Sequence, residues 1–146
     1  GSTWPRDEVI LTNYIRKNPQ YNYIIAPHEM NNIDRLKKEA NALLFSAANQ
    51  QNICDTNVLI IDSIGLLSSI YRYGKMAYIG GGFGIGIHNV LEAIVFNIPV
   101  IFGPNYKRFN EDFKQWNKVF KAQAKLREES DADMFAQFLG EQARGK

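Results

Sequence analysis

The sequence predicts an α/β fold in which helices cover both faces of a parallel sheet. Short apolar runs alternate with amphipathic stretches along the chain, and this is the order that βαβ units require. Five glycines occupy seven positions in residues 80–86, directly after an apolar run and directly before a segment with helical spacing. A strand, a glycine turn and a helix in succession are typical of a Rossmann-like, nucleotide-binding sheet.

The predicted strands are short runs that are rich in apolar residues. They cover residues 23–26, 42–45, 58–61, 76–79 and 100–102, with a weaker sixth strand at 119–122.

The predicted helices lie between these strands and at the two ends of the chain. They cover residues 7–17, 32–40, 65–73, 89–96 and 130–139. Pro5 and two acidic residues mark the start of the first helix. Pro99 marks the end of the fourth, because the residue before a proline disfavours helical backbone.

Length and composition bound the class of protein. A chain of 146 residues, 45% of them hydrophobic, suits one globular domain over residues 1–146. Basic residues exceed acidic residues by only two and are scattered, which argues against a nucleic-acid partner. No apolar segment approaches the roughly 18 residues needed to span a bilayer, so we expect the chain as given to be soluble.

Four loops after predicted strands have chemistry suited to a ligand. In a parallel sheet, ligands bind outside the carboxyl ends of the strands, so these loops are the candidate site. They are residues 27–29, 62–66, 80–92 and 103–105.

The glycine run has two interpretations. Missing side chains let a ligand approach backbone N–H groups, and the following helix directs its positive end at the same place. The same glycines also suit a simple tight turn. The run matches neither the G-x-G-x-x-G pattern nor a P-loop, because Ile87 and His88 occupy the positions that would decide the match.

Several side chains in these loops also have two interpretations. Asn89 and Glu92 have the spacing of a helix-capping pair, but Glu92 is equally placed to accept the hydroxyls of a ribose. His28 suits a phosphate, a ribose or a loop cap. Asp62 and Ser63 are predicted to cap the next helix.

A metal site is not expected. His88 and Glu92 are four residues apart on one predicted helix face, but the sequence offers no third ligand nearby. We therefore expect neither a metal nor another cofactor.

Five motifs, taken in order, resemble the 3-deoxy-D-manno-octulosonic acid (Kdo) transferases of lipopolysaccharide synthesis. The resemblance spans nearly the whole chain but only the C-terminal half of such an enzyme. The motifs lie in residues 1–8, 25–28, 61–67, 80–92 and 103–105.

The resemblance implies a role for the chain and its partners. Such enzymes are two-lobed glycosyltransferases of the GT-B type, and this chain resembles the C-terminal lobe, which holds CMP-Kdo. The lipid A precursor and the catalytic base would belong to the missing N-terminal lobe, so no catalytic residue is expected here. The full-length protein would act at the cytoplasmic face of the bacterial inner membrane.

The resemblance also implies site residues by motif. CMP would be bound by Pro27, His28, Ile64, Gly65, Leu66, Asn89, Val90, Leu91 and Glu92, with Glu92 on the ribose hydroxyls. The donor phosphate or sugar would lie near Gly81, Gly82, Phe83, Gly84 and Gly86.

Two departures from the family pattern matter. His28 stands where many members have Arg, so a permanent charge is replaced by one that titrates near neutrality. Leu66 stands where many have Glu, so only backbone contacts are expected there. Two alternatives remain: a GT-B donor lobe for a UDP-sugar, and a non-catalytic α/β binding domain.

Overall fold

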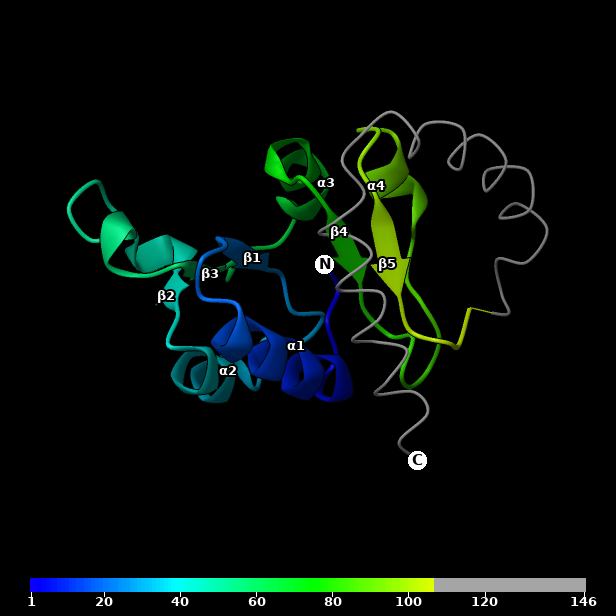
Figure 1. The fold of residues 1–146 in the computed structure, drawn as a ribbon, viewed down its shortest axis with the longest axis horizontal. Helices are drawn as coiled ribbons and strands as arrows, with labels where there is room; N and C mark the ends of the chain where they lie inside the picture. Colours follow the sequence, from blue (N-terminus) through cyan, green and yellow to red (C-terminus); the bar gives the residue numbers. More distant parts are fainter. Residues whose placement is uncertain (107–146) are drawn as a thin grey trace. The chain divides into compact units, whose positions relative to one another are not determined.

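The computed structural model describes residues 1–106 of the chain (Figure 1). The chain is divided into two compact units, Gly1–Ile70 and the part that begins at Tyr71. The single domain predicted over residues 1–146 stays a prediction. The predicted strand at 119–122 and the predicted helix at 130–139 lie outside the described residues.

The first unit contains a three-stranded parallel sheet. Its strands are β1 (Tyr23–Ile25), β2 (Leu43–Leu44) and β3 (Val58–Ile60), in the order β1-β3-β2. Ile60 of β3 is in register with Ile25 on one side and Leu44 on the other. The central strand is therefore the most buried, with Val58 and Ile60 at most 1% exposed.

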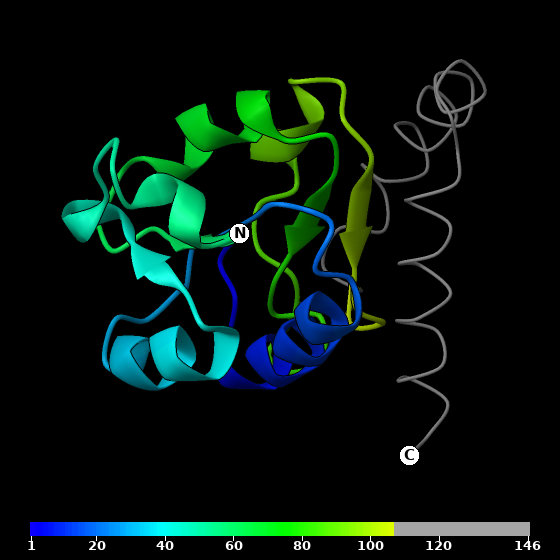
Figure 2. The same ribbon diagram turned by 60° about the vertical axis from the view of Figure 1, so that its left-hand side comes forward.

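Two helices pack beside each other on this sheet. They are α1 (Pro5–Lys17) and α2 (Ile33–Ala40), which lie side by side in both views (Figures 1 and 2). The Trp4 backbone N–H donates to the Asp7 carboxylate at 2.9 Å, so Asp7 closes the first turn of α1. Asn41 ends α2 in the left-handed region (φ +50°), which asparagine tolerates better than most residues.

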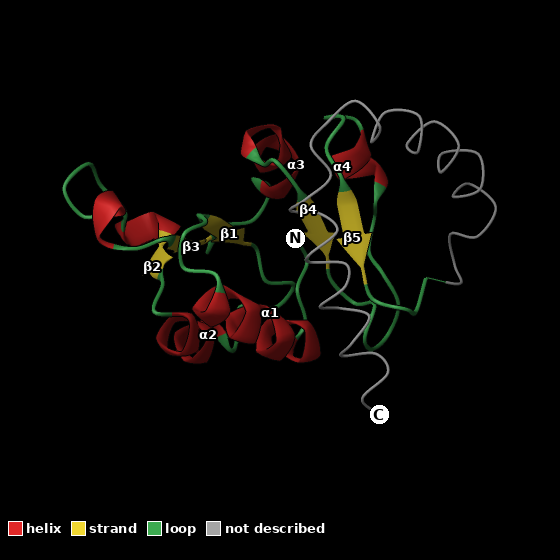
Figure 3. Cartoon of the chain, in the orientation of Figure 1, coloured by secondary structure: helices red, strands yellow, loops and turns green. Residues whose placement is uncertain are grey.

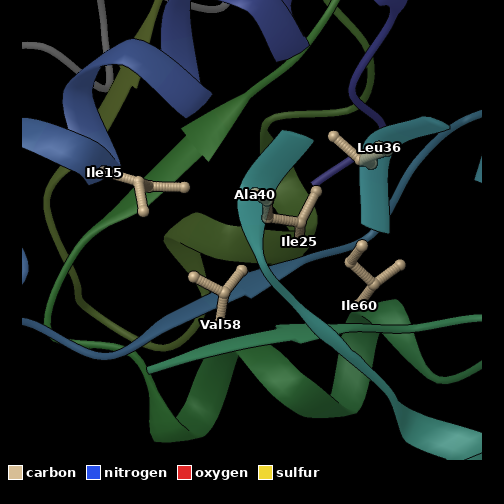
Figure 4. Close-up of a cluster of buried hydrophobic side chains, with 6 residues drawn as sticks. All are labelled: Ile15, Ile25, Leu36, Ala40, Val58 and Ile60. Atoms are coloured by element: carbon tan, nitrogen blue, oxygen red, sulfur yellow. The ribbon is translucent and has the colours of Figure 1, made fainter. Parts of the chain in front are cut away.

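The core of the first unit lies between these helices and the sheet (Figure 4). It contains Ile15 of α1 and Leu36 and Ala40 of α2, which pack on Ile25, Val58 and Ile60. The apolar spacing of α2 puts Leu36 and Ala40 on one face, four residues apart, and that face meets the sheet. The remainder of the unit is formed by η1 (Phe45–Ala47), η2 (Ile53–Asp55) and α3 (Leu67–Ile70).

The second unit contains a two-stranded parallel sheet. It comprises η3 (Tyr71–Tyr73), β4 (Ala77–Ile79), α4 (Leu91–Ile94) and β5 (Val100–Phe102) (Figure 3). Parallel strands require a crossover connection, and here the glycine run and α4 supply it. All three residues of β4 are buried.

The predicted strands are confirmed in the described residues, and all are parallel, as predicted. They pair as a sheet of three and a sheet of two. The predicted boundaries were wrong for two helices. The one predicted over residues 89–96 spans only Leu91–Ile94, and the one predicted over 65–73 is α3 followed by the 3₁₀ turn η3.

We predict that Leu36→Ala lowers the free energy of unfolding by about 2–5 kcal/mol, because the 1% exposed side chain leaves a cavity between α2 and the sheet. Val9→Ala on α1 is the matched control, since Val9 is half exposed, and should cost less than about 1 kcal/mol. Urea denaturation measures both. Equal losses would contradict the assigned core.

Candidate functional site

The N-terminal segment runs beside the loop that follows β1. The Thr3 N–H donates to the Ala26 carbonyl at 3.2 Å, and the His28 N–H donates to the Thr3 carbonyl at 2.8 Å. These bonds form a parallel bridge between Thr3 and Pro27. Residues 3–4, which come from the first resemblance motif, are thereby fixed next to residues 27–28 of the second.

Trp4 stacks on His28. The ring centroids are 4.4 Å apart and the planes make an angle of 22°. The indole therefore orients the exposed imidazole, a contact that sequence reasoning missed because the two residues are 24 positions apart. The Trp4 Nε1–H is buried and has no hydrogen-bond partner in the part of the chain that the structure describes.

Glu8 supports this segment from α1. It is 3% exposed and accepts from the Thr3 hydroxyl at 3.4 Å and from Arg35 of α2 at 2.8 Å. Arg35 also pairs with Glu39 at 2.9 Å. Burial raises the pKa of Glu8, and the positive charge of Arg35 and the Thr3 hydrogen bond only partly oppose that shift.

The loop after β3 is hydrogen-bonded at both ends and exposed to solvent at its tip. Ile64 is 95% exposed, and Gly65 adopts φ +89°. At the far end, the Leu66 carbonyl accepts the Ser69 and Ile70 N–H groups, both at 3.1 Å. At the near end, the Asp62 carboxylate accepts from Ser46 after β2, so the predicted helix cap by Asp62 was wrong.

The glycine run folds back on itself. The Gly81 carbonyl accepts the Gly84 N–H at 2.9 Å and the Gly86 N–H at 3.0 Å. Gly81 has φ +92°, and a Cβ there would lie 2.1 Å from the Gly86 carbonyl oxygen. The tight-turn interpretation therefore accounts for Gly81.

The loop after β5 packs against the glycine run and is hydrogen-bonded to it. A Cβ on Gly82 would lie 2.5 Å from the Gly103 nitrogen, so the two backbones meet where no side chain fits. Asn105 makes three hydrogen bonds to the run. Its N–H donates to Gly82 O at 2.9 Å, its side-chain amide donates to Gly84 O at 2.7 Å, and its carbonyl accepts the Ile87 N–H at 3.1 Å.

Gly84 differs from the other glycines of the run. It is exposed, its φ is not in the left-handed region, and a Cβ would come no closer than 4.0 Å to the Gly81 carbonyl oxygen. The folded backbone does not demand glycine at this position. A ligand that approaches the backbone closely would demand it.

Asn89 and Glu92 are hydrogen-bonded to each other, but the capping pair that their spacing predicts as one alternative was wrong in detail, because α4 begins after Val90 and Glu92 does not bond a cap N–H. The Asn89 Oδ1 accepts the Leu91 N–H at 3.0 Å, and its Nδ2 donates to Glu92 Oε1 at 3.2 Å. Glu92 also contributes to raising the pKa of the Tyr71 phenol, after the larger effect of burial. Asn89 is exposed, Leu91 is half exposed, Glu92 is partly buried and Val90 is buried.

The positive charge expected at the N-terminus of the helix after the glycine run is weaker than predicted. The helix α4 has one turn, which gives it a small dipole, and its Leu91 N–H is already bonded to Asn89 and so is not free for a ligand. The His88 N–H bonds the Gly80 carbonyl at 3.3 Å. Within residues 1–106, no three His, Cys, Asp or Glu side chains gather as a metal site would require.

No helix among the described residues has both the length and the apolar character needed to cross a membrane.

Comparisons with known proteins identify relatives of the chain. No protein-family model matches it. Over 108 residues, 71% of this chain, it is 32% identical to a 3-deoxy-D-manno-octulosonic acid transferase of Aquifex aeolicus (strain VF5). It is also 32% identical over 135 residues, 87% of the chain, to the enzyme of that name from Haemophilus influenzae. The chain spans 30% and 31% of these two curated relatives, about a third of their length.

A solved structure has the same fold. It is described as the C-terminal CMP-Kdo binding domain of WaaA from Acinetobacter baumannii, and it aligns with 96% of this chain and 84% of its own, with a TM-score of 0.67 and 20% identity. The chain therefore has the α/β fold of that domain. The resemblance to Kdo transferases is confirmed: the chain is a relative of these glycosyltransferases and matches one portion of their length.

We predict that two glycine substitutions in the same loop differ strongly in their effect on the free energy of unfolding. Gly81→Ala should lower the free energy of unfolding by about 3 kcal/mol, because the new Cβ meets the Gly86 carbonyl and φ is positive. Gly84→Ala should change it by less than about 0.5 kcal/mol. Urea denaturation compares them, and a large loss for Gly84→Ala would show that the fold itself requires this glycine.

We predict that Arg35→Gln destabilises the protein more at pH 7 than at pH 4. Burial raises the pKa of Glu8 in the folded protein. The protonated Glu8 therefore contributes to stability at a pH below its unfolded pKa, and this contribution is lost as the pH rises through its folded pKa. Without Arg35 the ionised carboxylate loses its partner, at a cost of about 1–3 kcal/mol at pH 7.

Urea denaturation at the two pH values measures this effect. Lys38→Gln, which removes an exposed charge from the same helix, is the control and should show no such pH dependence. An Arg35→Gln loss that is equal at both pH values would contradict the role of Glu8.

Proposed function

We propose that the chain is the donor-binding lobe of a Kdo transferase and that it binds the CMP portion of CMP-Kdo. The observation that carries the proposal is the 32% identity to two Kdo transferases over 71% and 87% of the chain. The fold supports it, because the matched structure is described as a CMP-Kdo binding domain. The motif residues also lie in loops that follow parallel strands, where α/β sheets bind ligands.

We assign the nucleotide contacts by motif. In the first unit, Pro27 and His28 contact the cytidine or its ribose, and Ile64, Gly65 and Leu66 supply contacts around the phosphate or base. The His28 ring is already oriented by Trp4, which lowers the entropy lost on binding.

In the second unit, Asn89, Val90, Leu91 and Glu92 contact CMP. Only one Glu92 oxygen bonds Asn89, at 3.2 Å, and a carboxylate has lone pairs for both ribose hydroxyls besides that bond. The donor phosphate or sugar approaches the run of Gly81, Gly82, Phe83, Gly84 and Gly86. Gly84 is its closest point, because glycine there has no structural cause in the described fold.

The chemistry of this lobe would be positioning. The reaction displaces CMP from the anomeric carbon of Kdo, and binding the leaving nucleotide in place stabilises the developing charge on its phosphate. The general base that deprotonates the acceptor hydroxyl would come from the missing lobe. The chain by itself should bind CMP weakly and transfer no sugar.

The resemblance also suggests a location. We propose that the full-length protein acts at the cytoplasmic face of a bacterial inner membrane, where its other lobe meets the lipid A precursor.

We predict that calorimetric titration of the chain shows tighter binding of CMP than of UMP or AMP. Glu92→Gln should weaken CMP about tenfold or more, because the amide keeps an oxygen for Asn89 but loses the charge that accepts ribose hydroxyls. Asp34→Asn, an exposed carboxylate on α2, is the charge-matched control and should leave affinity unchanged.

The competing outcomes separate the alternatives. Preference for UMP would support a donor lobe for a UDP-sugar. Absence of binding to any nucleotide at millimolar concentration, with Glu92→Ala changing stability alone, would favour a non-catalytic binding domain.

A further inference from the structure

The tip of the loop after β3 lacks packing of its own. Residues 63–65 are exposed, and Ile64 is 95% exposed. Apart from Gly65 itself and its two chain neighbours, no described residue has an atom within 4 Å of a Cβ built on Gly65. A segment without contacts takes its conformation from the two residues that anchor its ends.

One anchor is local and the other is not. At the far end, Leu66 accepts three hydrogen bonds from the first turn of α3, including one from the Ser69 hydroxyl at 2.9 Å. At the near end, Asp62 is joined to Ser46, sixteen residues earlier. The Ser46 N–H donates to Oδ1 at 2.9 Å, and the Ser46 hydroxyl donates to Oδ2.

The two-bond contact between Ser46 and Asp62 continues the pairing of β2 with β3. Leu44 is in register with Ile60, so Ser46 and Asp62 are the positions at which the ladder would go on. The chain leaves the strand at Phe45 to begin η1, whose first N–H groups have no partner within the helix. The Asp62 carboxylate takes one of them, which satisfies the donor and fixes Asp62 in one rotamer.

We propose that Asp62, acting through Ser46, is a positioning residue that presents Ile64, Gly65 and Leu66 to the nucleotide. This inference rests on the proposed function. Asp62 is assigned no contact with the ligand, and each of its two oxygens accepts a hydrogen bond from Ser46. The hydrogen bonds from Ser46 also lower the pKa of Asp62, so the carboxylate is ionised throughout the neutral range.

The test compares Asp62→Ala, Ser46→Ala and the double variant in the 146-residue chain. Asp62→Ala should weaken CMP about tenfold, and Ser46→Ala should have a smaller effect, because it keeps the backbone N–H bond. The double variant should be no weaker than Asp62→Ala, since both changes remove one interaction. Asp55→Ala removes an exposed carboxylate of the same unit and should leave CMP binding unchanged.

A second measurement separates positioning from loss of stability. In the ligand-free protein, Asp62→Ala should move the amide NMR signals of Ile64 and Gly65, while the signals of Ile25 and Ile60 in the core stay in place. Unchanged loop signals, or a fall in affinity that matches general unfolding, would overturn the proposal.

The two proposals fail in distinguishable ways. If wild-type protein binds no CMP and Asp62→Ala still moves the amide signals of Ile64 and Gly65, the proposed function fails. The claim that Asp62 fixes the conformation of the loop then remains valid. If wild-type protein binds CMP and Asp62→Ala binds it equally well, the positioning role fails and the proposed function stands.

Discussion

Parallel pairing is the constraint on which the rest of each unit depends. In the first unit, β1 and β2 both run parallel to β3, so the loops that follow these strands leave the same edge of the sheet. His28, Ser46 and Asp62 all come from such loops. In the second unit, β4 and β5 are parallel, and the glycine run and Asn105 leave the same edge. An antiparallel pairing of the same strands would separate these residues.

Close backbone approach is what the glycines of the second unit make possible. Gly82 and Gly103 meet at a distance that excludes any Cβ, and Asn105 can then reach the run with three hydrogen bonds. The fold therefore explains some glycines of this pattern and leaves another without a structural reason. Gly81, Gly82 and Gly103 are the explained glycines, and Gly84 is the other.

Local sequence signals predicted the elements well but not the contacts between them. Apolar runs gave the strands β1, β3, β4 and β5 within a residue or so, because burial in a parallel sheet needs continuous apolar stretches. The spacing of Asn89 and Glu92 predicted that the two residues act together, but they bond through their side chains and Val90 is the N-cap of α4. The helix predicted over 89–96 is a single turn, Leu91–Ile94, with Val90 and Val95 as its cap residues.

The missed features join residues that are far apart in the chain. Trp4 with His28, Arg35 with Glu8, and Ser46 with Asp62 are 24, 27 and 16 residues apart. No periodicity in the sequence links such pairs, since they depend on which strands are neighbours. Asp62 is an example. An aspartate at this position favours a local helix cap, but β2 is the neighbour of β3, and the Asp62 carboxylate accepts the Ser46 N–H that follows β2.

The central proposal is that the nucleotide is bound by loops that follow the carboxyl ends of the parallel strands in each unit. A map of amide NMR shifts during titration with CMP tests it most directly. The account predicts that the largest shifts fall in residues 27–28, 64–66 and 89–92, while residues that precede the strands, such as Asn57 and Gly74, stay unchanged. Shifts concentrated at those preceding residues would contradict it.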